Sequence, residues 1–382
     1  MDDPRRLDRC FRRRSRRQVV RGSLRRRLTP TVFGEGEIMG KTIVGLEVTE
    51  ESVRAAEISL GRKPQLVAYG EVPLPPEAAR DSEVLDSGAV AVALRQLWTG
   101  AKFKSKDAVL GVASRRILVR EYTTQAMRPD LLREALPYQV QDLLPVPASQ
   151  AVLDFFPLTQ DGDQVSGLLV AAVSENIEQI ISTLAKVKVR AQAVDLAAFG
   201  LARVTAPLAS PSETVATVNI GDHTTQVVIS RGGVPLFVRL LPIDVATGTT
   251  RRHNAEVVEP ELELAVAGNG MGGGTGVAAA SRTRGAIRAA MPPGVSDLAA
   301  RLRSTLAFFG SRPISVPLSR VFITGAGAAV EGVVPALGAA IDTPMTITSV
   351  GDVISMSTPP PTGEVALNLV GTVGIALGEV GR

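Results

Sequence analysis

Two short segments of the chain carry an acidic or amide residue, a small residue and hydroxyl residues in the same order. They are residues 47–52, with the sequence EVTEES, and residues 219–225, with the sequence NIGDHTT. Each follows a run of apolar and β-branched residues, so each is predicted to be a turn that joins two strands. Backbone N–H groups and hydroxyls in such a turn can bind phosphate oxygens, and a carboxylate at the end of the first strand can hold Mg²⁺ through water.

The second segment keeps the glycine and the hydroxyls of this pattern. Gly221 would let the backbone approach a phosphate closely, and Thr224 and Thr225 would supply hydroxyls. Asn219 stands where an acid is needed, which weakens the placement of Mg²⁺. We interpret His223, in the same turn, as a solvated loop residue rather than a catalytic base.

The first segment keeps the acid and a hydroxyl. Glu47 is the candidate that would hold Mg²⁺ through water, and the Ser52 hydroxyl is a candidate phosphate contact. Thr49 stands at the glycine position, where a β-branched residue narrows the approach of a phosphate and disfavours the backbone angle that a glycine could adopt. Glu50 and Glu51 add negative charge where the phosphate would lie.

Two further segments are rich in glycine. Residues 324–327 (TGAG) follow a predicted strand and precede a predicted helix, so Gly325 and Gly327 would let the backbone approach the adenine and ribose of a nucleotide. Residues 268–276 (GNGMGGGTG) contain a formal G-x-G-x-x-G pattern, but no strand precedes it and no helix follows it. We interpret this second segment as a surface loop.

The elements that would position these turns occur twice. Three antiparallel strands are predicted over residues 42–48, 53–59 and 65–72, and three more over 214–220, 225–230 and 234–243. In the first half a helix follows over residues 82–98, with Glu83 and Asp86 in its first turn, and then a strand over 107–113. Such a repeat predicts a duplicated α/β fold, with two lobes around a nucleotide cleft and one phosphate turn in each lobe.

Residues 114–190 interrupt this repeat with a pattern of their own. Strands are predicted over residues 116–122, 152–156 and 167–173. A helix over residues 129–144 should bend at Pro137, and a second helix should begin at a Ser174 cap. These residues are therefore predicted to form an inserted small α+β subdomain.

Composition excludes several classes of protein. Cys10 is the only cysteine, so an internal disulfide framework and a cysteine zinc site are excluded, which fits a reducing, cytoplasmic compartment. His223 and His253 are the only histidines, which excludes HExxH metalloproteases, and no G-x-S-x-G elbow is present. No convincing membrane span or signal peptide is found.

The first 38 residues are rich in arginine, with twelve Arg and three Asp among residues 1–30. Three interpretations remain open. Translation could begin at Met39, which directly precedes the first strand; the segment could be a disordered tail; or it could be a basic arm for nucleic acid or anionic lipid. We favour the start at Met39, so no nucleic-acid partner is expected.

Several segments together resemble the PilM family, the actin-like (FtsA-like) proteins of type IV pilus assembly. The strongest match is residues 137–155 (PYQVQDLLPVPASQAVLDF), followed by residues 219–243, 302–309 and 321–341. The resemblance implies a duplicated actin-like (ribonuclease H-like) fold and ATP with Mg²⁺ in the cleft. It also implies docking of the N-terminal tail of a PilN-like bitopic membrane protein, contact with the pilus motor platform, and a peripheral place at the inner face of the cell membrane through partners.

On this basis we predict the organisation of the chain. The first lobe spans residues 39–113, continued by 191–212 and 349–382; the inserted subdomain spans 114–190; the second lobe spans 213–348, including a Gly/Ala-rich part over 246–315; and residues 1–38 are an Arg-rich extension. The predicted function is a scaffold that binds and does not turn over. The alternative is an active ATPase or kinase of the actin, Hsp70 and sugar-kinase class, which the changed residues in both turns disfavour.

Overall fold

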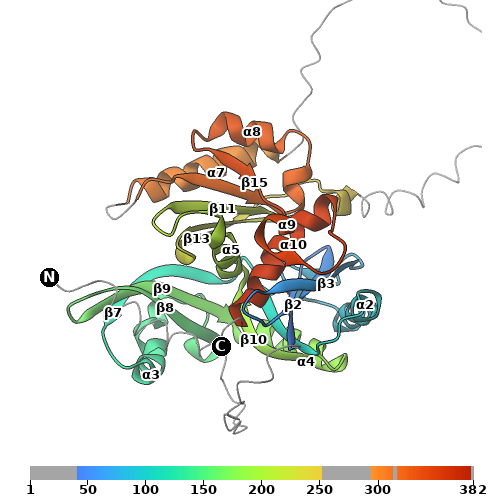
Figure 1. The fold of residues 1–382 in the computed structure, drawn as a ribbon. Coiled ribbons are helices and arrows are strands. Elements are labelled where there is room, and N and C mark those ends of the chain that lie inside the picture. The colour runs from blue at the N-terminus through green and yellow to red at the C-terminus, as the bar shows by residue number, and fades with distance from the viewer. Residues whose placement is uncertain (1–40, 252–293, 313–315, 380–382) are drawn as a thin grey trace, which may run out of the picture.

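The computed structural model describes residues 41–251, 294–312 and 316–379, which form two large sheets, a three-stranded sheet, a two-stranded hairpin and the helices around them (Figure 1). Residues 1–38 and the glycine-rich segment 268–276 lie outside the described residues. Among the described residues, no helix is both long and apolar enough to cross a membrane.

The first large sheet holds the first predicted repeat. Its strands, in spatial order, are β10 (Arg190–Leu196), β6 (Asp107–Val112), β1 (Thr42–Val48), β2 (Ser52–Ser59), β3 (Gln65–Pro73) and β16 (Ser355–Met356). Strands β1, β2 and β3 run antiparallel to one another in that order, β6 and β10 run parallel to β1, and β16 runs parallel to β3. Nearly every residue of β1 and β2 is buried, because helices pack on both faces of this sheet.

The second large sheet repeats the order and the directions of the first. Its strands are β13 (Val234–Pro242), β12 (Thr224–Arg231), β11 (Thr214–Ile220), β14 (Arg320–Thr324) and β15 (Met345–Ile347). The first three are antiparallel, and β14 runs parallel to β11 as β6 does to β1. The predicted duplication into two lobes is therefore confirmed.

Two helices join the lobes: α5 (Ala197–Thr205) and α10 (Gly363–Ala376), which lie between the two large sheets (Figure 1). They cross where Gly200 meets Gly374, so closely that a Cβ on Gly374 would lie 2.2 Å from the carbonyl oxygen of Gly200. Helices α7 (Val295–Gly310) and α8 (Val333–Ala340) pack on the second lobe, and the short α9 (Val350–Val353) precedes β16.

The predicted helix over residues 82–98 begins later than expected. Helix α2 spans Ser87–Gly100, and Asp86 is its N-cap, accepting hydrogen bonds from the backbone N–H groups of Gly88 and Ala89. Glu83 does not lie in this helix, because strands β4 (Ala79–Arg80) and β5 (Glu83–Val84) form a hairpin there. The two residues between these strands have positive φ angles, 53° and 60°, which a helix cannot contain.

The third sheet is built from β7 (Leu118–Gln125), β9 (Gln164–Val173) and β8 (Ala151–Asp161), all antiparallel. Helices α3 (Pro129–Gln139) and α4 (Ser174–Lys186) complete this unit; α3 contains Pro137 and is followed by a 3₁₀ turn, η2 (Gln141–Leu143). The expected Ser174 cap is absent: the N-cap position of α4 is Val173, and no side chain caps it.

Remaining 3₁₀ turns are η3 (Ala148–Gln150), η4 (Ala206–Leu208), η6 (Ala326–Ala329) and η7 (Leu377–Glu379).

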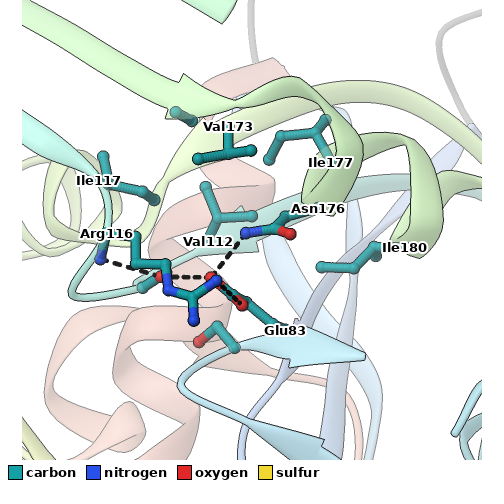
Figure 2. Close-up of a pocket in the computed structure, with 11 residues that line it drawn as sticks. Glu83, Val112, Arg116, Ile117, Val173, Asn176, Ile177 and Ile180 are labelled. Carbon is teal, nitrogen blue, oxygen red and sulfur yellow. Dashed lines mark hydrogen bonds and ion pairs between the residues drawn. The ribbon is translucent and has the colours of Figure 1, made fainter. Parts of the chain in front are cut away.

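Glu83 joins the third sheet and α4 to the first lobe. Its buried carboxylate accepts a hydrogen bond from Asn176 of α4 at 2.6 Å and forms an ion pair with Arg116 at 3.0 Å (Figure 2). Ser114 donates a further hydrogen bond at 3.2 Å. Burial raises the pKa of Glu83, and Arg116 partly offsets that rise. These contacts border a cavity whose surrounding space, including space open to solvent, is about 280 Å³ and whose other walls are largely apolar, with Ile177 among them.

A second carboxyl group in this unit is expected to give stability a pH dependence. Burial raises the pKa of Asp154 in β8 to about 7, because only a backbone N–H and the more distant charge of Arg133 favour its ionised form. The folded protein then binds this proton more tightly than the unfolded chain, so the stabilisation is complete below pH about 4 and is lost as the pH rises through 7.

The variant Asp154→Asn is therefore expected to be more stable than the unmodified chain at pH 8, on the order of 2 kcal/mol, and equal to it near pH 4. Urea unfolding between pH 4 and 8 measures the difference. Asp161→Asn, at an exposed position on the same strand, is the control and should leave the pH profile unchanged. Parallel profiles for Asp154→Asn and the unmodified chain would contradict this assignment.

Candidate functional site

The two predicted turns are built in the same way. In the first lobe the N–H of Thr49 donates to the carbonyl of Ser52 at 2.9 Å, and in the second the N–H of Gly221 donates to the carbonyl of Thr224 at 3.1 Å. Neither Thr49 nor Gly221 has a positive φ angle. The expectation that threonine would strain the backbone here is therefore wrong, because this turn does not need the conformational freedom of glycine.

The turns face each other across a hollow of about 580 Å³ between the lobes. Five of the predicted site residues line this cleft: Glu47, Thr49, Asn219, Gly221 and Thr224. The sequence pattern therefore brings together residues 170 positions apart in the chain, because the duplicated lobes point the same turn at the same cleft.

The other four predicted residues lie behind this surface. Thr225 is fully buried, because successive side chains of a strand point to opposite faces and Thr224 takes the face toward the cleft. Ser52 is also buried, and its hydroxyl donates to Glu71 at 2.7 Å. Gly325 and Gly327 pack against the second turn rather than lining the hollow: a Cβ on either would lie within 2.5 Å of Ile220.

Arg54 is a cleft residue that the sequence pattern did not single out. It lies opposite Glu47 on β1 and opposite Glu71 on β3, and only 5% of it is exposed. Its Nε atom is 3.9 Å from a Glu71 oxygen, and Nη2 donates to the Thr49 hydroxyl at 3.4 Å. A charged residue between the apolar residues Val53 and Ala55 of a predicted strand is the signal that could have found it.

The position of Arg54 in the duplicated fold strengthens this assignment. Gln226 occupies the matching place in the second lobe, opposite Asn219, and is also buried at the cleft. The Gln226 side-chain oxygen and the Arg54 Nε atom both lack a hydrogen-bond partner among the described residues. Buried polar atoms without partners are uncommon in folded proteins, which makes these two matching positions unusual.

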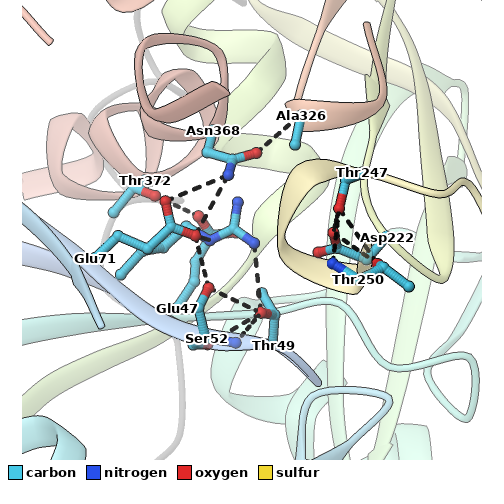
Figure 3. A network of polar contacts seen from close by, with 11 residues as sticks. Glu47, Thr49, Ser52, Glu71, Asp222, Thr247, Thr250, Ala326, Asn368 and Thr372 are labelled. Carbon is cyan, nitrogen blue, oxygen red and sulfur yellow. Dashed lines mark hydrogen bonds and ion pairs between the residues drawn. The ribbon is translucent and has the colours of Figure 1, made fainter. Parts of the chain in front are cut away.

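Glu47, the predicted Mg²⁺ residue, interacts with other residues of the protein. Burial raises its pKa, while Arg54 and a hydrogen bond from the Thr372 hydroxyl act in the opposite direction (Figure 3). In the part of the chain that the structure describes, no group of three or more His, Cys, Asp or Glu side chains could hold a metal ion. Together with Asn219 in the other turn, these observations do not fit a Mg²⁺ site, whereas Arg54 and Thr224 fit a phosphate group.

Thr49 also changes what the first turn can bind. Its hydroxyl accepts a hydrogen bond from the N–H of Ser52 at 3.1 Å and donates to the Ser52 carbonyl at 3.0 Å (Figure 3). A glycine here would leave that N–H free for a phosphate oxygen. The first turn therefore offers a ligand fewer donors than the second.

The segment predicted to contact adenosine, residues 324–327, is tied to the first lobe through α10. Asn368 accepts a hydrogen bond from the N–H of Ala326 at 2.8 Å and donates to both oxygens of Glu71, at 3.3 and 3.4 Å (Figure 3). Glu364, in the first turn of α10, accepts a hydrogen bond from the N–H of Gly248 at 2.8 Å. The segment that would contact adenine is thus bonded to the chain itself.

His223 is not the solvated residue that the sequence suggested. Its Nε2 atom lies 2.8 Å from a Glu51 oxygen of the first lobe, and its Nδ1 atom lies 2.8 Å from an Asp244 oxygen of its own lobe. The hydrogen bond to Glu51 is the main cause that raises the pKa of His223 to about 9, with desolvation opposing it and Asp244 adding to it. The imidazole is therefore protonated at neutral pH.

Comparison with known proteins agrees with this architecture. The solved structure "PilM-PilN type IV pilus biogenesis complex" is similar with a TM-score of 0.71 and 24% identity, over 89% of this chain and 99% of that chain. The cytoplasmic domain of EpsL, an inner membrane component of the type II secretion system of Vibrio cholerae, matches with a TM-score of 0.45 and 10% identity, over 88% of this chain and 95% of that chain.

The fold of the chain is thus actin-like, with two duplicated lobes around a cleft. A family model described as type IV pilus assembly protein PilM matches residues 45–243, more than half of the 382 residues. The matched residues include both cleft turns and the whole of the third sheet. The chain therefore belongs to the PilM family of type IV pilus assembly proteins.

Proposed function

We propose that this protein is a cytoplasmic scaffold of a type IV pilus assembly machine, which docks the N-terminal tail of a PilN-like bitopic membrane protein at the inner face of the membrane and couples it to the motor platform. Membership of the PilM family carries this proposal. The shared fold with a chain of the PilM–PilN complex, over nearly all of both chains, supports it.

We propose the cavity between α4 and the first lobe as the docking place. Its walls are apolar side chains, among them Ile117, Ile177 and Ile180, and the Glu83 carboxylate lies beside them (Figure 2). Such a cavity suits an apolar side chain of an extended tail, with a polar group of the tail at the carboxylate. Because two units of the chain form its walls, a docked tail would fix their relative position.

Nucleotide has a supporting role in this proposal. The groups that would contact a phosphate are Arg54, the Thr224 hydroxyl and the backbone of the second turn, and bound nucleotide would supply negative charge that draws both lobes toward it. Neither turn holds a complete acid and glycine pair, which favours binding over hydrolysis. We therefore expect nucleotide to change the affinity for the tail rather than to be consumed.

The test is fluorescence anisotropy with a labelled synthetic peptide of the N-terminal tail of the PilN-like partner. Ala172→Leu fills the cavity from β9 and is expected to weaken binding at least tenfold, which corresponds to about 1.4 kcal/mol. Ala185→Leu makes the same change at an exposed position of α4 and should bind normally.

The outcomes separate the parts of the proposal. A peptide that fails to bind the unmodified chain contradicts the scaffold function, and equal binding by Ala172→Leu contradicts the docking place alone. Repeating the titration with saturating ATP tests the supporting role of nucleotide: unchanged tail affinity, in protein shown by calorimetry to bind ATP, would contradict it.

A further inference from the structure

His223 and Glu51 occupy matching positions in the two lobes. Each is the third residue of its turn, because Thr49 pairs with Ser52 in the first turn as Gly221 pairs with Thr224 in the second. The tips of the two turns therefore meet at the mouth of the cleft. The 2.8 Å hydrogen bond from the His223 Nε2 atom to Glu51 joins the first lobe to the second.

We propose that His223 and Glu51 form a latch that holds the two lobes together across the cleft in the absence of nucleotide. The second half of this proposal rests on the proposed function: when a nucleotide enters the cleft, its phosphate group replaces Glu51 as the hydrogen-bond acceptor for His223 Nε2. His223 thus has two states: bound to the first lobe when the cleft is shut, and bound to the ligand when it is filled.

The two partners of the ring have different tasks. A histidine ring that meets a carboxylate at each nitrogen donates two hydrogen bonds only when both nitrogens carry a proton. Asp244 belongs to the same lobe as His223 and is 89% exposed, so its hydrogen bond sets the orientation of the ring. The Glu51 side chain is 9% exposed and belongs to the other lobe, so its bond is the one that joins the lobes.

Charge around the latch explains why a cation is needed there. Glu50 and Asp222 lie beside it in the two turns, and Asp81 and Glu47 line the same cleft. With only Arg54 and His223 as cations among these lining residues, carboxylates of the two lobes would repel each other if His223 lost its charge. A phosphate group meets the same repulsion, so the latch also disfavours nucleotide until His223 turns toward it.

The latch should open with increasing pH. Because the pKa of His223 is raised from 6.5 to about 9, its contribution is complete below pH 6.5 and is lost as the pH rises through 9. Glu51, Asp244 and Glu50 are the carboxylates that raise this pKa.

The experiment is hydrogen exchange, followed by mass spectrometry, on the full chain at pH 7. His223→Gln and Glu51→Gln are each expected to speed exchange at least tenfold in peptides that cover residues 47–54 and 219–226. The double variant should exchange no faster than either single variant, because the two changes remove one bond. Asp244→Asn removes the same charge as Glu51→Gln but no contact between the lobes, and it should leave the first turn unchanged.

Calorimetric titration of the same variants with ATP tests the second part. Glu51→Gln frees His223 for phosphate, so this variant is expected to bind ATP at least fivefold more tightly than the unmodified chain. His223→Gln also opens the latch and speeds exchange, but it lacks the imidazole and should not show this gain in ATP affinity. If exchange changes as expected while no variant binds ATP, the latch is supported and the nucleotide role in the proposed function fails. If exchange at both turns is unchanged in His223→Gln and Glu51→Gln, the latch is overturned whatever ATP does.

Discussion

Replacing Arg54 with methionine is expected to lower the free energy of unfolding by about 3 kcal/mol at pH 7. The guanidinium lies buried between Glu47 and Glu71, and the charges of both carboxylates raise its pKa against the desolvation that lowers it. Methionine fills a similar volume but leaves two carboxylates buried without their cation. Urea unfolding followed by circular dichroism measures the loss.

The effect of Arg54→Met depends on the charge of the neighbouring carboxylates, so removing that charge serves as the control. The loss should shrink at acidic pH, because burial raises the pKa of Glu47 and the protonated Glu47 no longer needs a cation. The triple variant Glu47→Gln, Arg54→Met, Glu71→Gln removes the charges together and is expected to recover most of the stability at pH 7. If Arg54→Met unfolds at the same urea concentration as the unmodified chain at pH 7, Arg54 is not the cation that the cleft requires.

Gly374→Ala is expected to destabilise the protein by about 3 kcal/mol, at the upper end of overpacking effects. The new Cβ atom would lie 2.2 Å from the backbone oxygen of Gly200, and backbone atoms cannot move aside as a flexible side chain can. Helices α5 and α10 would have to separate, and both lobes pack on them. Thermal unfolding measures the loss of stability. Because separation of the two helices would also loosen the contact between the lobes, hydrogen exchange at the two cleft turns should become faster.

Gly371→Ala provides the matched control one turn earlier on α10. Its Cβ atom would meet no atom closer than 3.6 Å, which is ordinary van der Waals contact. Alanine is also a better helix former than glycine, so Gly371→Ala should be neutral or slightly stabilising. Equal thermal stability of the two variants would show that the crossing of α5 and α10 can relax, contrary to the expectation for Gly374→Ala.

Local pattern was enough to predict the repeated part of the fold. Runs of apolar and β-branched residues predicted every strand of the two large sheets that flanks a cleft turn, and the repeat of that pattern predicted two lobes. The start of α2 was predicted too early, because a hairpin turn with two positive φ angles has no strong signal in the residues Asp81 and Ser82. Glycine or asparagine at these positions would have revealed the turn.

Part of the candidate site could also be predicted from local sequence. Residue types within each turn identified Glu47, Thr49, Asn219, Gly221 and Thr224 as cleft residues, because their places follow from the strand that precedes or follows the turn. The sequence by itself thus determined the family, the duplication and which turns border the cleft, whereas it also assigned Ser52 and Thr225 to the site although both are buried behind it.

Only the tertiary structure decided how the cleft is filled. Arg54 lies between two acids on neighbouring strands, and His223 meets a carboxylate 172 positions earlier in the chain. Neither pairing has a local signature, since both depend on the register between strands and on the distance between lobes. The physical reason is that charge is neutralised by whichever group lies nearest in space, and in this fold the nearest groups come from separate strands and from opposite lobes.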